Sequence, residues 1–402
     1  MHWYYAIATL AVIGQLLFVF HAARNYCYVL SKLRRKPPAY YPSAALIVPC
    51  KGLDLQFEQN ITSFFKQDYD NYTLYFVVAD RSDPAYDRLQ KLKSRLSSTS
   101  KAKDVQVLVA GRSTSCSEKL HNLLYCCKMA GPNAEIFAFA DSDIYVRRDW
   151  LCNLVWPLRL PKHGVTTGYR WFVPTQSNLA TLALSAINGK VTQLLGNVRW
   201  NLAWGGSMAV RAAEFRRLDI EGLWQTAVSD DLSLSRAVKK AGMKVLFVPA
   251  CLVTSYESTT WRRLFEFTRR QLLITRIYTP VSWWFGLASA LGSVLSLWGS
   301  IAMAFYAAAT GYGYLPLFAA VPVFCLASQV ARAILRQRMA RILLKEDMPR
   351  LKSAAAADIF LSWLWSILLF LFISTSAFGR TISWRGIRYR LVSPTETIIQ
   401  DN

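Results

Sequence analysis

Two carboxylates separated by one residue, in the run Asp141-Ser142-Asp143, are the first candidates for chemistry. Side chains two residues apart on an extended segment point the same way, so both could bind one hard cation such as Mg²⁺ or Mn²⁺. A divalent cation held there could neutralise a diphosphate leaving group. A lone Asp-x-Asp pattern is weak evidence, and helix capping is the alternative role for such residues.

A second carboxylate pair occurs at Asp230-Asp231, directly after Ser229 and before a helix expected over Leu232–Ala241. Adjacent carboxylates repel, which raises the pKa of one of them toward a value useful for general-base catalysis. We predict that Asp231 takes the proton from an attacking hydroxyl. Alternatively, Ser229 or Asp230 caps the helix and Asp231 lies in its first turn, and the two roles are compatible.

Two more loops with polar residues or glycine directly follow short apolar runs of the sequence. The loop Pro49-Cys50-Lys51-Gly52 follows one run and Asp80 follows the next. We assign Pro49, Lys51, Gly52 and Asp80 to donor binding, with Asp80 placed to accept hydrogen bonds from uracil or ribose. A simple turn is the alternative role for Asp80.

The run Trp204-Gly205-Gly206-Ser207-Met208 joins an aromatic ring to two glycines. Glycines let backbone approach a ligand closely, and the ring could pack on a sugar or an acyl chain. We assign Trp204, Gly205 and Gly206, together with Asp230, to acceptor binding. A tight turn into a strand is an equally good interpretation.

The elements that must position these residues are short apolar runs alternating with amphipathic stretches between Arg35 and Arg276. This alternation predicts an α/β domain with a mainly parallel sheet. Ligands bind at the carboxyl ends of strands in such sheets, where the candidate residues fall. The expected strands are Ala44–Val48, Leu74–Val78, Val105–Ala110 and Ile136–Ala140, and two expected helices are Pro84–Leu96 and Glu118–Ala130.

Apolar segments flank this domain. The uncharged run Trp3–Phe20 is long enough to cross a bilayer, and Arg24, Lys32, Arg34 and Arg35 follow it. Because the basic residues come after the run, we expect an uncleaved anchor with its basic end in the cytosol, and not a cleaved signal peptide.

A second apolar region has no Lys, Arg, Asp or Glu between Arg276 and Arg332. Glycines and Pro316 interrupt it near residues 311–316, so two helices are expected, roughly Val281–Ala308 and Tyr314–Ala331. A third segment runs over Ile359–Phe378, after the basic stretch Arg332–Lys352, which is expected to face the cytosol. The tail after Phe378 is also basic, and both basic segments cannot face the cytosol if one full crossing separates them. One apolar segment could therefore be interfacial or re-entrant, and the number of crossings stays open.

The chain carries a formal net charge of +22, and 53% of its 402 residues are hydrophobic. Many of the cations flank apolar segments, which favours an anionic membrane surface over nucleic acid as the partner. The basic amphipathic stretch Trp261–Thr275 is typical of an interfacial helix, from which Arg269, Arg270 or Gln271 could reach donor phosphates. The scattered cysteines and the unpaired histidines favour neither a disulfide framework nor a zinc site.

The order of these features resembles the ceramide glucosyltransferases of glycosyltransferase family 21 over nearly the whole chain. The segments that carry the resemblance are Pro49-Cys50-Lys51-Gly52-Leu53-Asp54, Val78-Ala79-Asp80 with Asp83-Pro84-Ala85, Lys119 with Asn122-Leu123, Asp141-Ser142-Asp143-Ile144-Tyr145, Trp204-Gly205-Gly206-Ser207-Met208, Ser229-Asp230-Asp231 and, more weakly, Thr381-Ile382-Ser383-Trp384-Arg385 with Arg388-Tyr389-Arg390-Leu391.

The resemblance implies a GT-A-like nucleotide-sugar-binding domain between membrane helices. It places Asp80 on the uridine, Lys119 at the donor, Asp141 and Asp143 on the metal and diphosphate, and Asp231 as base in an inverting transfer. Animal-type members carry Arg-x-x-Arg-Trp where this chain has Arg270-Gln271-Leu272-Leu273-Ile274, and plant-type members also lack the last Arg and Trp.

The expected organisation is therefore an anchor over residues 1–24, a cytosolic catalytic domain over 36–258, an interfacial helix over 259–280, membrane helices over 281–378 and a basic tail over 379–402. The expected activity is UDP-glucose:ceramide transfer with Mg²⁺ or Mn²⁺ in an integral membrane protein of the Golgi, the endoplasmic reticulum or a bacterial inner membrane. The alternatives are transfer to a hopanoid or diacylglycerol, a polysaccharide synthase, and a non-catalytic lipid-binding scaffold.

Overall fold

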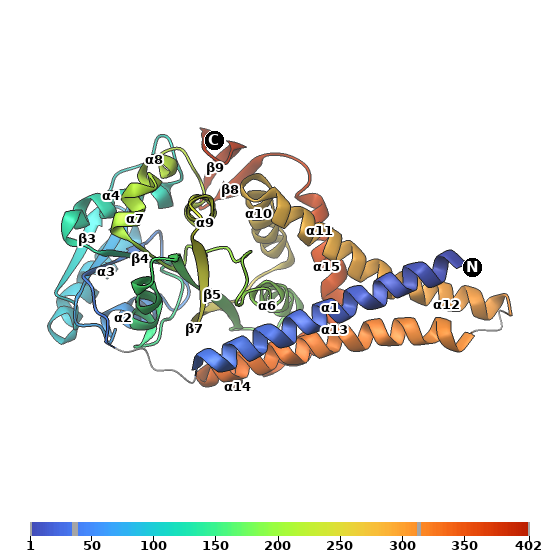
Figure 1. Cartoon of the computed structure of the whole chain (residues 1–402). Helices are drawn as coiled ribbons and strands as arrows, with labels where there is room; N and C mark the ends of the chain where they lie inside the picture. The colour runs from blue at the N-terminus through green and yellow to red at the C-terminus, as the bar shows by residue number, and fades with distance from the viewer. Residues whose placement is uncertain (1, 34–38, 312–314, 401–402) are drawn as a thin grey trace. The chain divides into compact units, whose positions relative to one another are not determined.

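The computed structural model describes residues 2–33, 39–311 and 315–400 and divides into two compact units (Figure 1). The sheet unit comprises Ser31–Val173, Leu195–Glu257 and Arg380–Asn402, and the helical unit comprises Met1–Leu30, Pro174–Leu194 and Ser258–Gly379. The predictions that involve Arg34, Arg35 and the start of a helix at Tyr314 fall outside the described residues. The predicted boundaries of the five segments stay a prediction.

A seven-stranded sheet in the order β3-β2-β1-β4-β6-β5-β7 forms the centre of the sheet unit. The four strands from β3 to β4 pair in parallel, whereas β6 runs antiparallel to both β4 and β5. The α/β class and the mainly parallel sheet are thus confirmed. The strands are β1 (Ala44–Pro49), β2 (Tyr72–Val78), β3 (Asp104–Val109), β4 (Ile136–Ala140), β5 (His163–Pro174), β6 (Ser207–Arg211) and β7 (Lys244–Glu257).

Both faces of this sheet are buried, as a period of two in strand side chains predicts. In β1, Leu46 and Val48 pack into one core, whereas Ala45 and Ile47 pack into the other. Helices α2 (Phe57–Phe65), α3 (Pro84–Leu96) and α5 (Trp150–Val155) supply the first core, and α4 (Glu118–Ala130), α7 (Ala212–Arg217), α8 (Ile220–Trp224) and α9 (Asp230–Lys240) supply the second.

The predicted elements agree closely with those observed in this half of the chain. Strand β4 and helices α3 and α4 have the predicted bounds. Strands β1 and β2 differ from prediction by one and two residues at one end, and β3 differs by one residue at each end. Side-chain caps explain the sharp helix starts: Asp83 accepts a hydrogen bond from the backbone of Ala85, and Ser117 accepts one from Leu120.

The C-terminal tail of the sheet unit forms a second, three-stranded antiparallel sheet in the order β10-β9-β8. Its strands are β8 (Thr381–Trp384), β9 (Ile387–Ser393) and β10 (Glu396–Gln400). The Tyr389 hydroxyl accepts a hydrogen bond from the Glu118 backbone N–H at 3.4 Å, and Thr226 donates one to the Thr395 carbonyl at 2.6 Å. The basic tail is therefore fastened to α4 and to the loop before α9.

The helical unit contains long apolar helices. It has α1 (His2–Leu33), α6 (Leu179–Thr192), α10 (Trp261–Tyr278), α11 (Pro280–Val294), α12 (Ser300–Ala309), α13 (Leu315–Leu343), α14 (Met348–Phe360) and α15 (Ser362–Thr375), with a short π-helical stretch over Leu295–Gly299 between α11 and α12. Three spans in the described residues are long and apolar enough to cross a membrane: Tyr4–Leu33, Pro280–Ala309 and Leu315–Leu343. These helices indicate an integral membrane protein.

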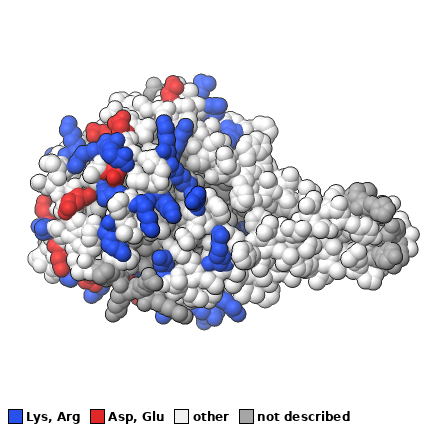
Figure 2. All heavy atoms as spheres, in the orientation of Figure 1, with Lys and Arg blue, Asp and Glu red and all other residues white. Residues whose placement is uncertain are grey.

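Within this unit α1 and α13 run side by side (Figure 1), with Tyr4 stacked on Phe318 at 4.4 Å between ring centroids. On the face shown in Figure 2, the outer parts of α12 and α13 carry no visible charged side chain. Such a surface suits the hydrocarbon of a bilayer, where backbone groups must be satisfied within the helix.

The last two apolar segments differ from the prediction. Helix α13 does not end near Ala331 but continues through Arg332 to Leu343, because that stretch keeps good helix formers and buries Arg336 and Met339. The third segment does not form one straight helix: α14 and α15 meet at a bend of 83° around Leu361. Helix α15 alone has 14 residues, or about 21 Å at the helical rise, which is short for a full crossing.

Candidate active site

One strand end and two helix starts bring the candidate residues together in the sheet unit. Asp141 directly follows β4, Lys119 lies in the first turn of α4, and Asp230 and Asp231 open α9. Ser229 caps α9 by accepting a hydrogen bond from the Leu232 N–H. The two helix starts and the strand end therefore point their first side chains at one place.

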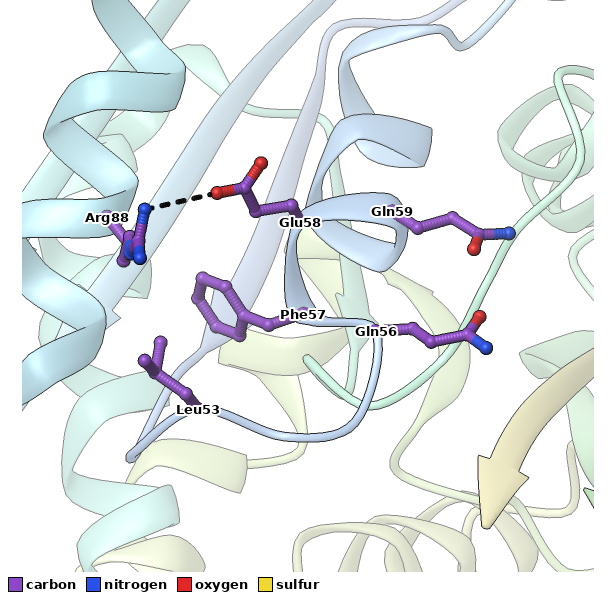
Figure 3. Close-up of a pocket in the computed structure, with 6 residues that line it drawn as sticks. All are labelled: Leu53, Gln56, Phe57, Glu58, Gln59 and Arg88. Carbon is purple, nitrogen blue, oxygen red and sulfur yellow. Dashed lines mark hydrogen bonds and ion pairs between the residues drawn. The ribbon is translucent and has the colours of Figure 1, made fainter. Parts of the chain in front are cut away.

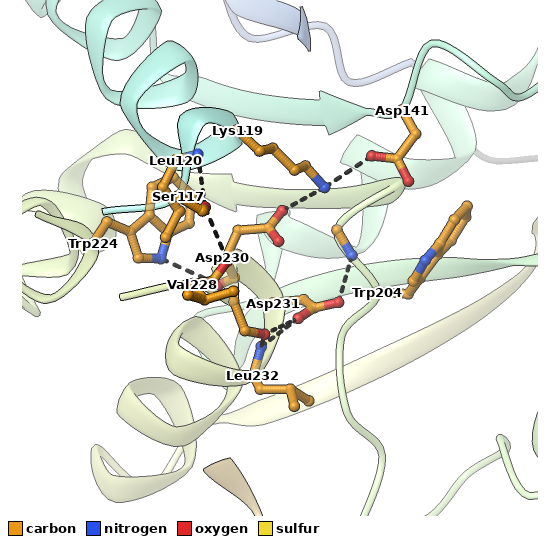
Figure 4. Close-up of polar contacts among 12 residues, drawn as sticks. Ser117, Lys119, Leu120, Asp141, Trp204, Trp224, Val228, Asp230, Asp231 and Leu232 are labelled. Atoms are coloured by element: carbon orange, nitrogen blue, oxygen red, sulfur yellow. Dashed lines mark hydrogen bonds and ion pairs between the residues drawn. The ribbon is translucent and has the colours of Figure 1, made fainter. Parts of the chain in front are cut away.

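Lys119 joins the two carboxylate motifs (Figure 4). Its ammonium lies 2.8 Å from Asp141 Oδ1 and 3.0 Å from Asp230 Oδ2. These two aspartates are 89 positions apart in the sequence (230 − 141), so only the folded sheet can bring them to one cation. All three side chains are at least four-fifths buried.

Burial and charge act in opposite directions on these groups. Burial by itself would lower the pKa of Lys119, but Asp141 and Asp230 beside it raise that pKa above its ordinary value. For Asp141, burial would raise the pKa, but Lys119 and Arg170 hold it below the usual range. For Asp230, burial together with the nearby Asp231 and Asp141 raises the pKa to about 6.

Arg170, on β5, binds both members of the Asp-x-Asp motif. Its guanidinium donates to Asp141 Oδ2 at 2.7 Å and to Asp143 Oδ2 at 3.0 Å. The same guanidinium lies 4.6 Å from the centroid of the Trp204 ring, within cation–π range. A forked donor of this kind fixes the direction of both carboxylates.

The two glycines after Trp204 are required by close packing. A Cβ at Gly205 would collide with the Asp230 carboxylate, and a Cβ at Gly206 would collide with the Trp204 ring and with Asp141. The strand β6 begins at the next residue, so the turn into a strand proposed as the alternative is also present. The glycines thus let this turn lie directly against the carboxylates.

Asp231 accepts hydrogen bonds from three groups around it. The Gly205 N–H donates to Oδ2 at 3.0 Å, whereas the Leu232 N–H at 2.7 Å and the Ser229 hydroxyl at 2.5 Å donate to Oδ1. Its side chain is only partly buried, unlike that of Asp230. Asp231 is therefore held in a fixed orientation and remains open to solvent.

The donor-loop residues are tied to their neighbours. The Lys51 ammonium lies 2.8 Å from Glu118 Oε1, and the Gly52 N–H donates to Asp83 Oδ1 at 2.9 Å. Gly52 has a φ of 68°, which a side chain would strain. Pro49 is the last residue of β1, so its position places it at the carboxyl edge of the sheet.

Asp80 lies in an exposed turn after β2. It accepts hydrogen bonds from the Ser82 N–H at 2.9 Å and from the Ser82 hydroxyl at 3.0 Å, and these bonds lower its pKa. The turn geometry of its alternative role is thus present. Its role toward a nucleotide stays a prediction.

Arg270 and Gln271 lie on α10, which belongs to the helical unit, so their contribution to the site stays a prediction. An open pocket beside α2 (Figure 3) is lined by none of the candidate residues. Its charged residues, Glu58 and Arg88, form an exposed ion pair with 3.4 Å between their closest atoms. We assign no catalytic role to that pocket.

The chain matches glycosyl transferase family 21 over residues 5–397. The chain belongs to that family. The expected family is confirmed, and the protein is an enzyme of glycosyl transfer.

Two solved structures have some similarity to this family 21 chain. One is a mannosyltransferase from Pyrobaculum calidifontis in complex with GDP-Man and Mn²⁺, at 16% identity and a TM-score of 0.47, covering 92% of this chain and 97% of that one. The other is GalNAc-T7 with UDP, GalNAc and Mn²⁺, at 13% identity and a TM-score of 0.39, covering 58% of this chain and 51% of that one.

The carboxylates of this glycosyl transferase suit a divalent cation, although they cannot complete its coordination alone. Asp143 Oδ1 is buried and has no hydrogen-bond partner, which suits a ligand atom for a cation. Within the described residues no group of three or more His, Cys, Asp or Glu could hold a metal. Mg²⁺ commonly takes one or two carboxylates and completes its shell with water and phosphate oxygens.

Arg170, Asp54 and Arg385 contact this site in the family 21 chain, although no role was predicted for them. Arg170 comes from β5, in the antiparallel half of the sheet, and nothing in its local sequence marks it. Asp54 and Arg385 occur in the segments that carry the family resemblance and form an ion pair at 2.7 Å. The pattern of apolar residues along the sequence cannot predict that two residues 331 positions apart (385 − 54) form an ion pair.

Proposed function

We propose that this protein transfers glucose from UDP-glucose to the primary hydroxyl of ceramide, giving glucosylceramide at the cytosolic face of a membrane. Membership of family 21 supports glycosyl transfer. The observation that carries the proposal is the Lys119 bridge, because it places the Asp141 motif and the Asp230-Asp231 pair at one site.

On the donor side of the proposed site, charged residues would bind a cation and the diphosphate of the donor. A bound Mg²⁺ or Mn²⁺ would supply Lewis-acid neutralisation of the leaving diphosphate. Asp141 and Asp143 would hold that cation, and the unpartnered Asp143 Oδ1 supports this assignment. Lys119 and Arg170 keep the carboxylates fixed before the donor arrives, so their orientation costs nothing during reaction.

The acceptor side needs a base that can reach a hydroxyl. Asp231 takes the proton as the lipid oxygen attacks the anomeric carbon, the bond from that carbon to the diphosphate breaks, and UDP leaves. The Gly205 N–H and the Ser229 hydroxyl hold this carboxylate in place. A single in-line displacement of this kind inverts the anomeric centre.

The membrane supplies the acceptor in this proposal. Three apolar spans anchor the chain, and α10 presents Arg262, Arg269 and Arg270 on an amphipathic helix. Basic amphipathic helices lie at the bilayer interface, where cytosolic anionic lipids attract them. A Golgi, endoplasmic-reticulum or bacterial inner membrane would suit this arrangement.

The test is a lipid-product assay with membranes that contain the protein. Labelled UDP-glucose, UDP-galactose and GDP-mannose are each offered with ceramide, diacylglycerol or a hopanoid, with Mg²⁺, with Mn²⁺ or with a chelator, and products are identified by mass spectrometry. The proposal predicts glucosylceramide from UDP-glucose, lost on chelation. Product formed from another lipid alone refutes the ceramide assignment, soluble polymer points to a polysaccharide synthase, and no product from any pair refutes the proposal.

A further inference from the structure

The turn between β8 and β9 holds a non-glycine residue, Arg385, in a left-handed backbone conformation that its residue type disfavours. Trp384 pairs with Ile387 across the hairpin, so Arg385 and Gly386 form a two-residue loop. Both have positive φ, 51° and 84°. This is the pattern of a type I′ turn, which favours Asn, Asp or Gly at its first central position and disfavours a residue such as Arg.

The Arg385 side chain reaches the loop after β1. Its guanidinium donates to Asp54 Oδ1 at 2.7 Å and to the Lys51 carbonyl at 3.2 Å. The other Asp54 oxygen accepts a hydrogen bond from Ser142, the residue between Asp141 and Asp143, at 3.2 Å. The tail of the chain is thereby connected to the Asp-x-Asp motif through one partly buried carboxylate.

A second strained residue, Gln56, lies in the loop after β1 that Arg385 contacts. Of the three non-glycine residues with positive φ in the described part of the chain, one is Arg385 and another is Gln56, two positions after Asp54. Strained backbone that is retained against its local cost is concentrated at ligand sites and switch regions. The two strained residues therefore flank the carboxylate that Arg385 binds.

Arg385 has spare hydrogen-bonding capacity. A guanidinium carries five N–H donors, and the bonds to Asp54 and Lys51 use two of them. The Arg385 side chain is 44% exposed, whereas that of Asp54 is 16% exposed. Burial would lower the pKa of Arg385, but Asp54, Asp143 and Asp141 raise it, so the guanidinium lies within the field of the motif.

We propose that Arg385 binds the diphosphate of the nucleotide-sugar donor and that Asp54 holds its guanidinium in position for that contact. A planar guanidinium with free donors is suited to two phosphate oxygens at once. The C-terminal sheet then completes the donor site, since Tyr389 and Thr395 fasten it to α4 and to the loop before α9. This inference rests on the proposed function in requiring a nucleotide-diphosphate donor.

The test uses Arg385→Asn in the detergent-solubilised full chain, because Asn suits the type I′ turn and should keep the hairpin folded. Arg388→Asn, on an exposed position of the same hairpin, is the matched control for charge and residue type. UDP and uridine are the probes, measured by calorimetry with Mg²⁺ or Mn²⁺, and melting temperature is recorded for each variant.

The inference predicts that Arg385→Asn weakens UDP binding about tenfold or more, as expected for loss of a charge-assisted contact, and leaves uridine binding unchanged. Arg388→Asn should bind UDP like wild type. Equal UDP affinity in all three proteins overturns the inference. An equal loss for UDP and uridine, with a lowered melting temperature, also overturns it and makes Arg385 a structural latch.

The outcome separates this inference from the proposed function. Wild type that binds UDP but forms no glucosylceramide refutes the acceptor assignment and leaves the Arg385 comparison valid. Wild type that forms glucosylceramide while Arg385→Asn keeps its affinity for UDP refutes only the role of Arg385. Wild type that binds no UDP at all refutes both.

Discussion

At the scale of residues, the site consists of paired opposite charges in a buried setting. Lys119 and Arg170 each hold two aspartates, and each of the four aspartate contacts is 3.0 Å or shorter. Removing one partner of a buried pair is costly because the other charge is left uncompensated. Loss of either cation would therefore leave two aspartates of the site without their charged partner.

Asp230 gives the site a dependence on pH. Its pKa of about 6 in the folded protein lies above the ordinary 3.8, so the carboxylate is charged above pH 6 and neutral below it. Its neutral form favours the folded state below pH 3.8, and this contribution is lost as the pH rises through 6.

Transfer should therefore fall as the pH drops through about 6, by about tenfold per pH unit, because neutral Asp230 no longer pairs with Lys119. Asp230→Asn should have lower transfer at neutral pH and lack this acid limb. The profile of kcat/KM against pH is the measurement, with Asp87→Asn, at an exposed position of α3, as control. An acid limb unchanged in Asp230→Asn would contradict the assignment.

At the scale of elements, sequence pattern predicted the parallel half of the sheet well. Strand β4 was predicted to the residue because a five-residue buried run ends abruptly at Asp141. Periodicity cannot tell which later strand pairs with β4, so the antiparallel insertion of β6 and the contribution of Arg170 from β5 were not predicted. The aspartates were named from the sequence and Lys119 through the family resemblance, whereas Arg170 was not named because nothing in its local sequence marks it.

The turn before β6 makes a prediction at this scale. Gly205→Ala should reduce transfer at least about tenfold and destabilise the fold by about 1–3 kcal/mol, because its Cβ would collide with the Asp230 carboxylate. Transfer rate and melting temperature are the measurements. Gly292→Ala, inside α11 and with nothing within 4 Å of a Cβ, should lower neither the transfer rate nor the melting temperature, since Ala is the better helix former. Wild-type behaviour of Gly205→Ala would show that the turn can move aside.

At the scale of the whole molecule, the helical unit depends on a buried polar cluster as well as on its apolar spans. Arg336 on α13 donates to Asp358 on α14 at 2.8 and 2.6 Å, and to Gln193 at 2.8 Å. The Arg336 and Asp358 side chains are 3% and 0% exposed. Apolar composition alone predicted a helix end near Ala331, because it does not register that Arg336 has a buried partner.

We expect the ion pair between Arg336 and Asp358 to contribute to the stability of the helical unit. Asp358→Asn should destabilise it by about 3–5 kcal/mol, because a buried guanidinium would lose its charged partner. The double variant Arg336→Met with Asp358→Leu should recover most of that loss, since apolar replacement of a whole pair is often neutral. Thermal unfolding in detergent is the measurement. Equal melting temperatures for wild type and Asp358→Asn would show that the pair contributes little.

The most direct test of the catalytic account is transfer and UDP binding measured on one preparation of Asp231→Asn beside wild type. The substitution keeps the shape of the side chain and removes the base, so glucosylceramide formation should fall about 10²- to 10⁴-fold while UDP affinity stays within about twofold. Transfer that survives the substitution would contradict Asp231 as the base. Loss of UDP affinity together with transfer would place Asp231 on the donor side of the site instead.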